Sequence, residues 1–241
     1  MTQIEFIAEC QRLFALNGLP CTTEQAEMLF LLTDRMLTVN QSMNLTAIKE
    51  EKSVILRHYV DSLTIMREIP EAARVMDVGC GAGFPTLPLA IARPDLTIVA
   101  LDGTAKRIHY VQETAGLLGL SNVTAIAGRA EEYAHQNDYR ETFDVVTARA
   151  VASLPVLCEL CLPFVRIGGA LIAMKSAQVQ EELAQAAKCI EICGGRVTNC
   201  RSCDLMDGTV NESRTLIVVS KIVPTPKNYP RHFSKISKKP L

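Results

Sequence analysis

The stretch Val75-Met76-Asp77-Val78-Gly79-Cys80-Gly81-Ala82-Gly83-Phe84 is the most informative part of this chain. Its apolar start predicts a short strand, and the glycines at alternate positions predict a tight turn before a helix. Because glycine has no Cβ atom, a flat ligand can come close to the backbone at such a turn. The stretch therefore predicts a strand–turn–helix unit that binds a nucleoside.

The spacing of the glycines argues against a dinucleotide. In a dinucleotide fingerprint the third glycine follows the second by three residues, and that position is Phe84 here. A D-x-G-x-G-x-G turn suits a ligand without a pyrophosphate, because fewer backbone amides need to face an anion. The pattern favours a nucleoside that carries methionine and disfavours a nicotinamide-dependent oxidoreductase.

Downstream of the turn, short β-rich runs alternate with amphipathic stretches, which is typical of a parallel sheet with crossover helices. We expect helices between the first five strands. The last two strands lack a helix-length connection, so we expect them to form an antiparallel pair at one edge. The expected strands cover residues 74–78, 97–101, 123–127, 143–147, 170–174, 196–200 and 215–220.

Upstream of the turn the sequence is helical. Thr2-x-x-Glu5 and Thr22-x-x-Gln25 resemble capping boxes, and apolar residues follow each at helical spacing. A third helical stretch is expected to end near Pro70. The expected parts are an N-terminal helical cap (1–70), a sheet domain (71–222) and a basic C-terminal tail (223–241).

Composition limits the class of protein. The 241 residues can bury one sizeable core. The first residues do not resemble a secretory signal, and no apolar run is long enough to span a bilayer, so we expect a soluble cytoplasmic protein. The nine cysteines are expected to be reduced thiols. Structural zinc at Cys158-x-x-Cys161 and Cys200-x-x-Cys203 is disfavoured, and no metal site is expected.

The net charge of −1 hides a basic end. From residue 213 onward there is no Asp or Glu. Such an end contacts phosphates or forms a solvated tail, and the sequence leaves both open. Its basic residues are Arg214, Lys221, Lys227, Arg231, Lys235, Lys238 and Lys239.

Candidate site residues follow the ends of the predicted strands. Asp102 comes about twenty residues after the glycine turn, where a carboxylate accepts ribose hydroxyls in folds of this kind, although it could instead cap the next helix. Ala130 and Glu131 follow the third strand and are candidate base contacts. Arg149 follows the fourth strand, and we expect its guanidinium in the active cleft, since it needs carboxylate or phosphate partners.

These motifs together resemble the family of small-subunit ribosomal RNA guanine-N7 methyltransferases, RsmG, once called glucose-inhibited division protein B. The resemblance covers nearly the whole chain. It rests on residues 43–48, 57–63, 77–85, 102–107, 148–150, 174–175, 229–231 and 238–241.

The resemblance implies a Rossmann-like class I fold that uses S-adenosylmethionine to methylate N7 of a guanine in 16S rRNA. The implied partner is 16S rRNA or the small ribosomal subunit, without an obligate protein partner. Arg149 and Lys175 are the candidate catalytic groups. The candidate donor-binding residues, some from matching motifs and some from the turn and second strand, are Gly79, Gly81, Gly83, Phe84, Asp102, Ala130, Glu131 and Arg149.

The chemistry suits these residues. Guanine N7 carries an unshared electron pair, so it can attack a sulfonium methyl group without a general base. His58, near Asp61, is expected either to touch substrate or to make a structural hydrogen bond. The alternatives are a methyltransferase for a small molecule or protein, and a non-catalytic module that binds nucleoside and RNA.

Overall fold

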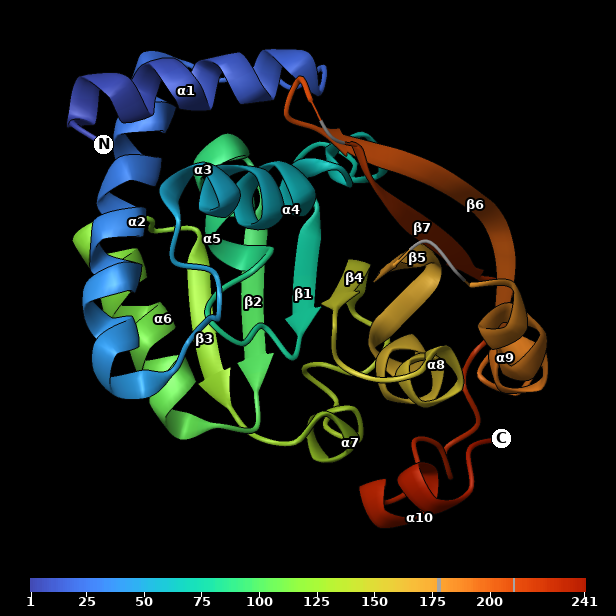
Figure 1. Ribbon diagram of the computed structural model, residues 1–241. Helices are drawn as coiled ribbons and strands as arrows, with labels where there is room; N and C mark the ends of the chain where they lie inside the picture. The colour runs from blue at the N-terminus through green and yellow to red at the C-terminus, as the bar shows by residue number, and fades with distance from the viewer. Residues whose placement is uncertain (177–178, 210) are drawn as a thin grey trace.

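The computed structural model, which describes residues 1–176, 179–209 and 211–241, has a seven-stranded sheet in the order β3-β2-β1-β4-β5-β7-β6 (Figure 1). The first five strands are parallel, and β7 runs antiparallel to both β5 and β6. The predicted α/β class and the antiparallel pair at one edge are confirmed. The strands are β1 (Arg74–Val78), β2 (Thr97–Asp102), β3 (Val123–Ala127), β4 (Phe143–Arg149), β5 (Val165–Ser176), β6 (Gly195–Met206) and β7 (Asn211–Lys221).

The last three strands are longer than the sequence predicts. Strands β6 and β7 pair along almost their whole length, from Gly195 opposite Lys221 to Met206 opposite Asn211. Most of β6 is exposed, and beyond Cys200 only Cys203 and Leu205 alternate with polar neighbours toward the core, which is too short a pattern to predict a strand. The expected end of this strand at Cys200 is therefore too early.

Helices cover both faces of the sheet and form the N-terminal cap (Figure 1). Among the described residues, no helix combines the length and apolar character that a membrane span requires. The cap helices are α1 (Gln3–Leu16), α2 (Thr23–Met43), α3 (Glu51–Val54), η1 (Ile55–Val60), α4 (Asp61–Leu63) and η2 (Met66–Glu68). The others are α5 (Thr86–Ala92), α6 (Ala105–Leu117), α7 (Ala130–Tyr133), α8 (Leu154–Cys161), η3 (Leu162–Phe164), α9 (Gln180–Ile192) and α10 (Phe233–Lys238).

The third predicted helical stretch is present from Glu51 to Leu63, but it is not a uniform α-helix. Both capping boxes are present at α1 and α2, but the stretch after them changes from α3 into η1, a π-helix, and then into α4. A π-helix has one extra residue in its turn, so apolar spacing cannot distinguish it from an α-helix. The expected end near Pro70 is also wrong, because α4 ends at Leu63 and only a 3₁₀ turn follows.

The core has one apolar layer on each face of the sheet. Val75 of β1 packs with the cap, α5 and α6, whereas its neighbour Met76 packs with α8 and α9 on the opposite face. This alternation is the two-residue period of a strand that is buried on both faces. The cap therefore shares its core with the sheet, and the division of the chain at residues 70 and 222 stays a prediction.

The C-terminal tail folds back onto the sheet domain. In the tail, Arg231 forms an ion pair with Glu159 at 2.6 Å, and just before the tail Lys221, the buried last residue of β7, forms one with Glu141 at 3.0 Å. Helix α10 then lies against α8, near the end of the molecule toward which β1, β2 and β3 point (Figure 1). Of the two alternatives that the sequence left open for the basic end, solvation is therefore wrong for Lys221 and Arg231, and phosphate contact by the exposed lysines stays untested.

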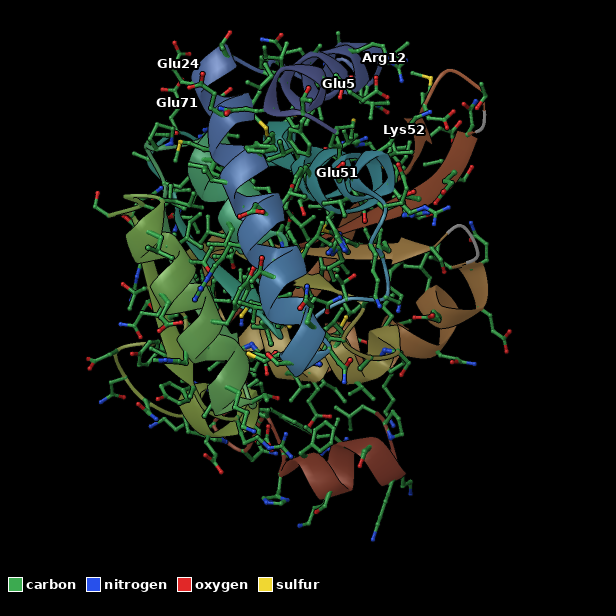
Figure 2. The ribbon with its side chains drawn as sticks, turned by 60° about the vertical axis from the view of Figure 1, so that its left-hand side comes forward. Glu5, Arg12, Glu24, Glu51, Lys52 and Glu71 are labelled. Carbon is green, nitrogen blue, oxygen red and sulfur yellow. The ribbon has the colours of Figure 1, made fainter. Side chains whose placement is uncertain are left out.

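The first helix of the cap is tied to the turn between β6 and β7. Asn17, at the end of α1, accepts a hydrogen bond from the amide of Met206 at 2.8 Å and donates one to its carbonyl at 2.9 Å. Arg12 donates to the carbonyl of Asp207, and Lys52 lies 3.6 Å from its carboxylate. Figure 2 shows Arg12 and Lys52 on the side of the cap nearest these strands.

We expect Asn17→Ala to lower the free energy of unfolding by about 1–2 kcal/mol, because two hydrogen bonds that join the cap to the hairpin are lost. Urea denaturation followed by circular dichroism measures the change. The matched control is Gln3→Ala on exposed α1 surface, which should be neutral. Equal midpoints for both variants would show that this tie contributes nothing.

Candidate functional site

A hollow of about 250 Å³ opens where β1, β2 and β3 end, and we call it the strand-end hollow. This edge of a parallel sheet is where ligands bind in open α/β folds. Its lining residues are Val78, Gly79, Leu101, Asp102, Gly103, Gly128, Arg129, Ala130, Glu131, Val151, Ala152, Leu160 and Phe233.

The glycine turn forms the floor of this hollow. The amides of Gly79 and Cys80 donate to the carbonyl of Leu101, at 2.7 and 3.1 Å, which fixes the turn against β2. Gly79 has a φ of +74°, and a Cβ atom there would lie 2.7 Å from a methyl group of Val151. A Cβ on Gly83 would instead meet Leu87 at 2.6 Å. Gly79 is thus required at the hollow, and Gly83 is required for packing.

Asp102 lies at the end of β2, buried, and lines the strand-end hollow. Its carboxylate accepts hydrogen bonds from the amide of Gly81 at 3.0 Å and from the amide of Thr104 at 2.8 Å. Each carboxylate oxygen can accept a further hydrogen bond. Asp102 therefore fixes the turn and the start of α6, and its oxygens keep the capacity to accept hydroxyl groups.

The third strand contributes the residues that were predicted after it. Ala130 and Glu131 begin α7, and both line the strand-end hollow. Glu131 is buried, so its side chain is not a solvated surface group. Gly128 allows α7 to pack closely, because a Cβ atom there would overlap the ring of Tyr133.

A residue that sequence reasoning missed lies beneath the turn. Asp77 is 1% exposed and accepts hydrogen bonds from the hydroxyl groups of Thr86, at 2.6 Å, and Thr147, at 3.3 Å. Burial raises the pKa of Asp77 to about 6, while these hydrogen bonds oppose the shift. The signal was its place at the end of a buried strand, where a carboxylate needs partners.

A second hollow, of about 440 Å³, lies between the cap and the ends of β4, β5 and β7, and we call it the cap-side hollow. Four basic side chains and two carboxylates line it, so it favours an anionic ligand. Its lining residues are Ile48, Arg57, His58, Asp61, Arg149, Ala150, Met174, Lys175, Ser176, Glu182, Arg214 and Leu216.

Arg149 lies in the cap-side hollow and not among the residues that line the strand-end hollow. Its guanidinium donates to Asp61 at 3.0 Å and to the carbonyl of Arg57 at 3.1 Å. It also lies 5.3 Å from the ring centroid of Phe84. Phe84 does not line the strand-end hollow either, because its ring stacks on His58 with centroids 4.4 Å apart.

The π-helix η1 and the residue after it place three cap side chains in this hollow. Arg57 and His58 belong to η1, and Asp61 follows it. Burial raises the pKa of Asp61, while the positive charges of Arg149 and Arg214 oppose that shift. π-Helical turns often occur at functional sites, yet the sequence carried no signal for this one.

His58 makes the structural hydrogen bond that was one of the two alternatives from the sequence, and contact with substrate stays a prediction. Its Nε2 lies 2.9 Å from the hydroxyl group of Thr46, and the residue also lines the cap-side hollow. Burial, and then the nearby charge of Arg149, lower the pKa of His58 to about 3. The imidazole is therefore neutral at physiological pH.

Lys175, at the end of β5, lies at the boundary between the two hollows. Its ammonium group is 2.7 Å from the carboxylate of Glu182 and donates to the carbonyl of Ala152 at 3.0 Å. Ala152 lines the strand-end hollow, whereas Lys175 itself lines the cap-side hollow. The segment after β4 thus separates the two hollows, and Lys175 fixes that segment.

Comparison with solved structures identifies the class of fold. The chain is similar to a SAM-dependent methyltransferase from Aquifex aeolicus, at 19% identity and a TM-score of 0.50, over 66% of this chain and 89% of the other. It is also similar to M. jannaschii TYW2 in complex with AdoMet, at 16% identity and a TM-score of 0.53, over 68% of this chain and 76% of the other. The fold is that of class I methyltransferases.

Sequence comparison identifies the family. A family model described as rRNA small subunit methyltransferase G matches residues 25–211. Relatives named ribosomal RNA small subunit methyltransferase G include one from Lactobacillus johnsonii, 43% identical over 86% of this chain and 88% of its own length. Another, from Desulforamulus reducens, is 40% identical over 94% of this chain and 100% of its own length. The chain belongs to this family, which confirms the predicted resemblance.

The methyl donor is S-adenosylmethionine, which supplies an activated methyl group on a sulfonium when it is bound. The strand-end hollow fits its nucleoside part. The floor at Gly79 lacks a side chain, Asp102, Arg129 and Glu131 are the charged lining residues, and apolar side chains such as Leu160 also line the hollow. A few polar groups among apolar ones are typical of small-molecule sites.

The pKa of His58 predicts how stability depends on pH. The unfolded imidazole takes up a proton near pH 6.5, whereas the folded one does so only near pH 3, so the unfolded state binds more protons between these values. The free energy of unfolding should fall as the pH is lowered from 6.5, by up to about 1.4 kcal/mol per pH unit from this group. In His58→Gln the free energy of unfolding should fall less steeply with decreasing pH, because the contribution of this imidazole is absent.

Urea denaturation at about pH 4.5, 5.5, 6.5 and 7.5 tests this expectation, because the series runs from above the pKa of the unfolded imidazole into the range where only the unfolded state is protonated. The control is His109→Gln, whose side chain is 76% exposed, and it should keep the slope of the unaltered protein. The contribution of Asp77 is common to all three proteins. Parallel curves for the unaltered protein and His58→Gln would contradict a neutral buried imidazole.

Proposed function

We propose that the protein transfers the methyl group of S-adenosylmethionine to N7 of a guanine in 16S rRNA by direct in-line displacement. The observation that carries the proposal is the arrangement of the segment after β4. Arg149 and Ala150 line the cap-side hollow, and Val151 and Ala152 line the strand-end hollow. A donor in the strand-end hollow and a base in the cap-side hollow would therefore meet across this segment.

The donor-binding residues divide by position. Gly79, Asp102, Ala130 and Glu131 line the strand-end hollow and would contact the donor directly. A second set would act through the turn and the boundary of the hollow. The amide of Gly81 donates a hydrogen bond to Asp102, and Gly83 packs on Leu87. Phe84 stacks on His58, and Arg149 lies beside the ring of Phe84.

The groups around the cap-side hollow suit a reaction without a general base. His58 is neutral and hydrogen-bonded to Thr46, and Asp61 is held by Arg149. Guanine N7 needs no deprotonation, so the protein has only to place it in line with the methyl group. Such positioning can contribute about 7–11 kcal/mol to the lowering of the barrier. Arg149 and Lys175 would hold guanine O6 or phosphate and would not carry protons.

The charge of the cap-side hollow supports RNA as the acceptor. Arg57, Arg149, Lys175 and Arg214 line it. Phosphate contacts by such side chains position a nucleic acid, and they favour RNA over an uncharged small molecule or a protein. We propose 16S rRNA, free or within the small subunit, as the partner, with no obligate protein partner.

The proposed reaction predicts one 7-methylguanosine in small-subunit RNA. We expect RNA from cells without this gene to lack that nucleoside, and the purified protein with S-adenosylmethionine to restore it, as measured by mass spectrometry of nuclease fragments. Free 16S rRNA and intact subunits are compared as acceptors in parallel. If neither free 16S rRNA nor the intact subunit gains an N7 methyl group, the assigned acceptor is wrong.

The rate should also be nearly independent of pH around neutrality. A logarithmic rate plot of unit slope between about pH 6 and 8 would indicate an essential base and contradict direct transfer.

Asp102→Ala should weaken binding of S-adenosylhomocysteine, the donor product, roughly 10- to 100-fold, because hydrogen bonds to a buried charged group are worth about 1.5–3 kcal/mol. Isothermal titration calorimetry measures this directly. Asp102→Asn keeps the size of the side chain and separates the loss of charge from the loss of shape.

The matched control for Asp102 is Arg57→Ala, which alters a side chain that lines the cap-side hollow and not the strand-end hollow. It should retain product binding within a factor of about three while methylation falls. If Asp102→Ala binds as tightly as the unaltered protein, Asp102 is only a cap for α6.

A further inference from the structure

The C-terminal segment reaches the strand-end hollow. Phe233, the first residue of α10, lines this hollow together with Ala130 and Leu160, although it lies more than seventy residues from either in the sequence. The guanidinium carbon of Arg129 lies 5.3 Å from the centroid of the Phe233 ring. Figure 1 shows α10 beside α7 and α8, below the ends of the strands.

A buried ion pair fixes the segment just before Phe233. Glu159, on α8, is 0% exposed, and its carboxylate accepts three hydrogen bonds from Arg231: from the backbone amide at 2.9 Å, from Nε at 2.8 Å and from Nη2 at 2.6 Å. A carboxylate without water needs such partners, so the pair holds Arg231 at α8. Phe233 follows two residues later and is placed by the same contact.

Further contacts hold the whole segment on the sheet domain. Arg140 donates to the carbonyls of Thr225 at 2.8 Å and Tyr229 at 2.9 Å, and Nε2 of His135 lies 2.9 Å from the carbonyl of Pro230. Ile236 of α10 is fully buried in the apolar layer that contains α8. These contacts lie on both sides of Phe233 in the sequence. They fix its position at the rim of the strand-end hollow, where its ring forms a wall.

We propose that the C-terminal segment completes the donor site: Phe233 forms the wall beside the adenine base, and the Arg231–Glu159 pair holds that wall in place. The inference rests on the proposed donor site in the strand-end hollow. Aromatic rings favour flat bases as neighbours, and the base would otherwise be open to water on this side. Because coupling between two events is reciprocal, a bound donor also stabilises α10 against opening.

The first test is calorimetric titration of the full-length protein with S-adenosylhomocysteine. Phe233→Ala should raise the Kd roughly 10-fold, since one base–aromatic contact is lost. Phe233→Leu keeps part of the apolar wall and should have a smaller effect. The matched control is Lys238→Ala, which alters an exposed side chain of the same helix and should leave the Kd unchanged.

The second test needs no substitution and so does not depend on the folding of a variant. Hydrogen exchange of the backbone amides of residues 233–239 is measured in the unaltered protein with and without S-adenosylhomocysteine. The proposal predicts slower exchange in the complex. Equal exchange rates at saturating ligand would overturn it.

Asp102→Ala separates this inference from the proposed donor site. If Asp102→Ala weakens product binding and a folded Phe233→Ala does not, the wall is wrong and the donor site stands. If neither variant weakens binding, the donor site itself is wrong and the inference falls with it. If Phe233→Ala alone weakens binding, the wall is supported and the role of Asp102 is limited to the turn.

Discussion

The whole site depends on how the turn after β1 is held. The buried carboxylate of Asp77 accepts hydrogen bonds from Thr86 at the start of α5 and from Thr147 in β4. Above it, the carbonyl of Leu101 in β2 accepts the amides of Gly79 and Cys80. Helix α5 and strands β4 and β2 thus hold the short stretch from Asp77 to Cys80. Because interiors are close-packed, a change in any of these contacts would move the floor of the hollow and the glycines with it.

The cap belongs to the site as much as the sheet does. The ring of Phe84 leaves the glycine turn and stacks on His58 of the cap, and Arg149 lies over the same ring. Asp61 joins Arg149 to Arg214 on β7 through contacts of 3.0 and 3.5 Å. A chain of aromatic and charged contacts therefore joins the turn, the π-helix and the far edge of the sheet, so that the two hollows share one set of supports.

The sequence predicted those features that depend on local pattern. The apolar run before Gly79 and the alternation of strands and helices after it predicted the fold class. The position of Asp102 after the next strand predicted one side of the strand-end hollow. The π-helix was missed because its apolar residues keep helical spacing. The resemblance implied that Phe84 contacts the donor, but the direction of its side chain depends on the backbone of the turn, and its ring stacks on His58. Arg231 and Glu159 are 72 residues apart, and no local pattern joins them.

The positions of the two chain ends have a practical consequence for anyone who prepares this protein. Figure 1 shows the N-terminus beside α1, at the opposite end of the molecule from α10. Leu241 packs on the apolar layer that also holds Phe233, whereas Met1 is about half exposed and packs on neither apolar layer. An affinity tag fused after Leu241 would crowd the region beside the strand-end hollow. A tag fused before Met1 leaves that region free and removes only the surface contact between the terminal amine and Glu51.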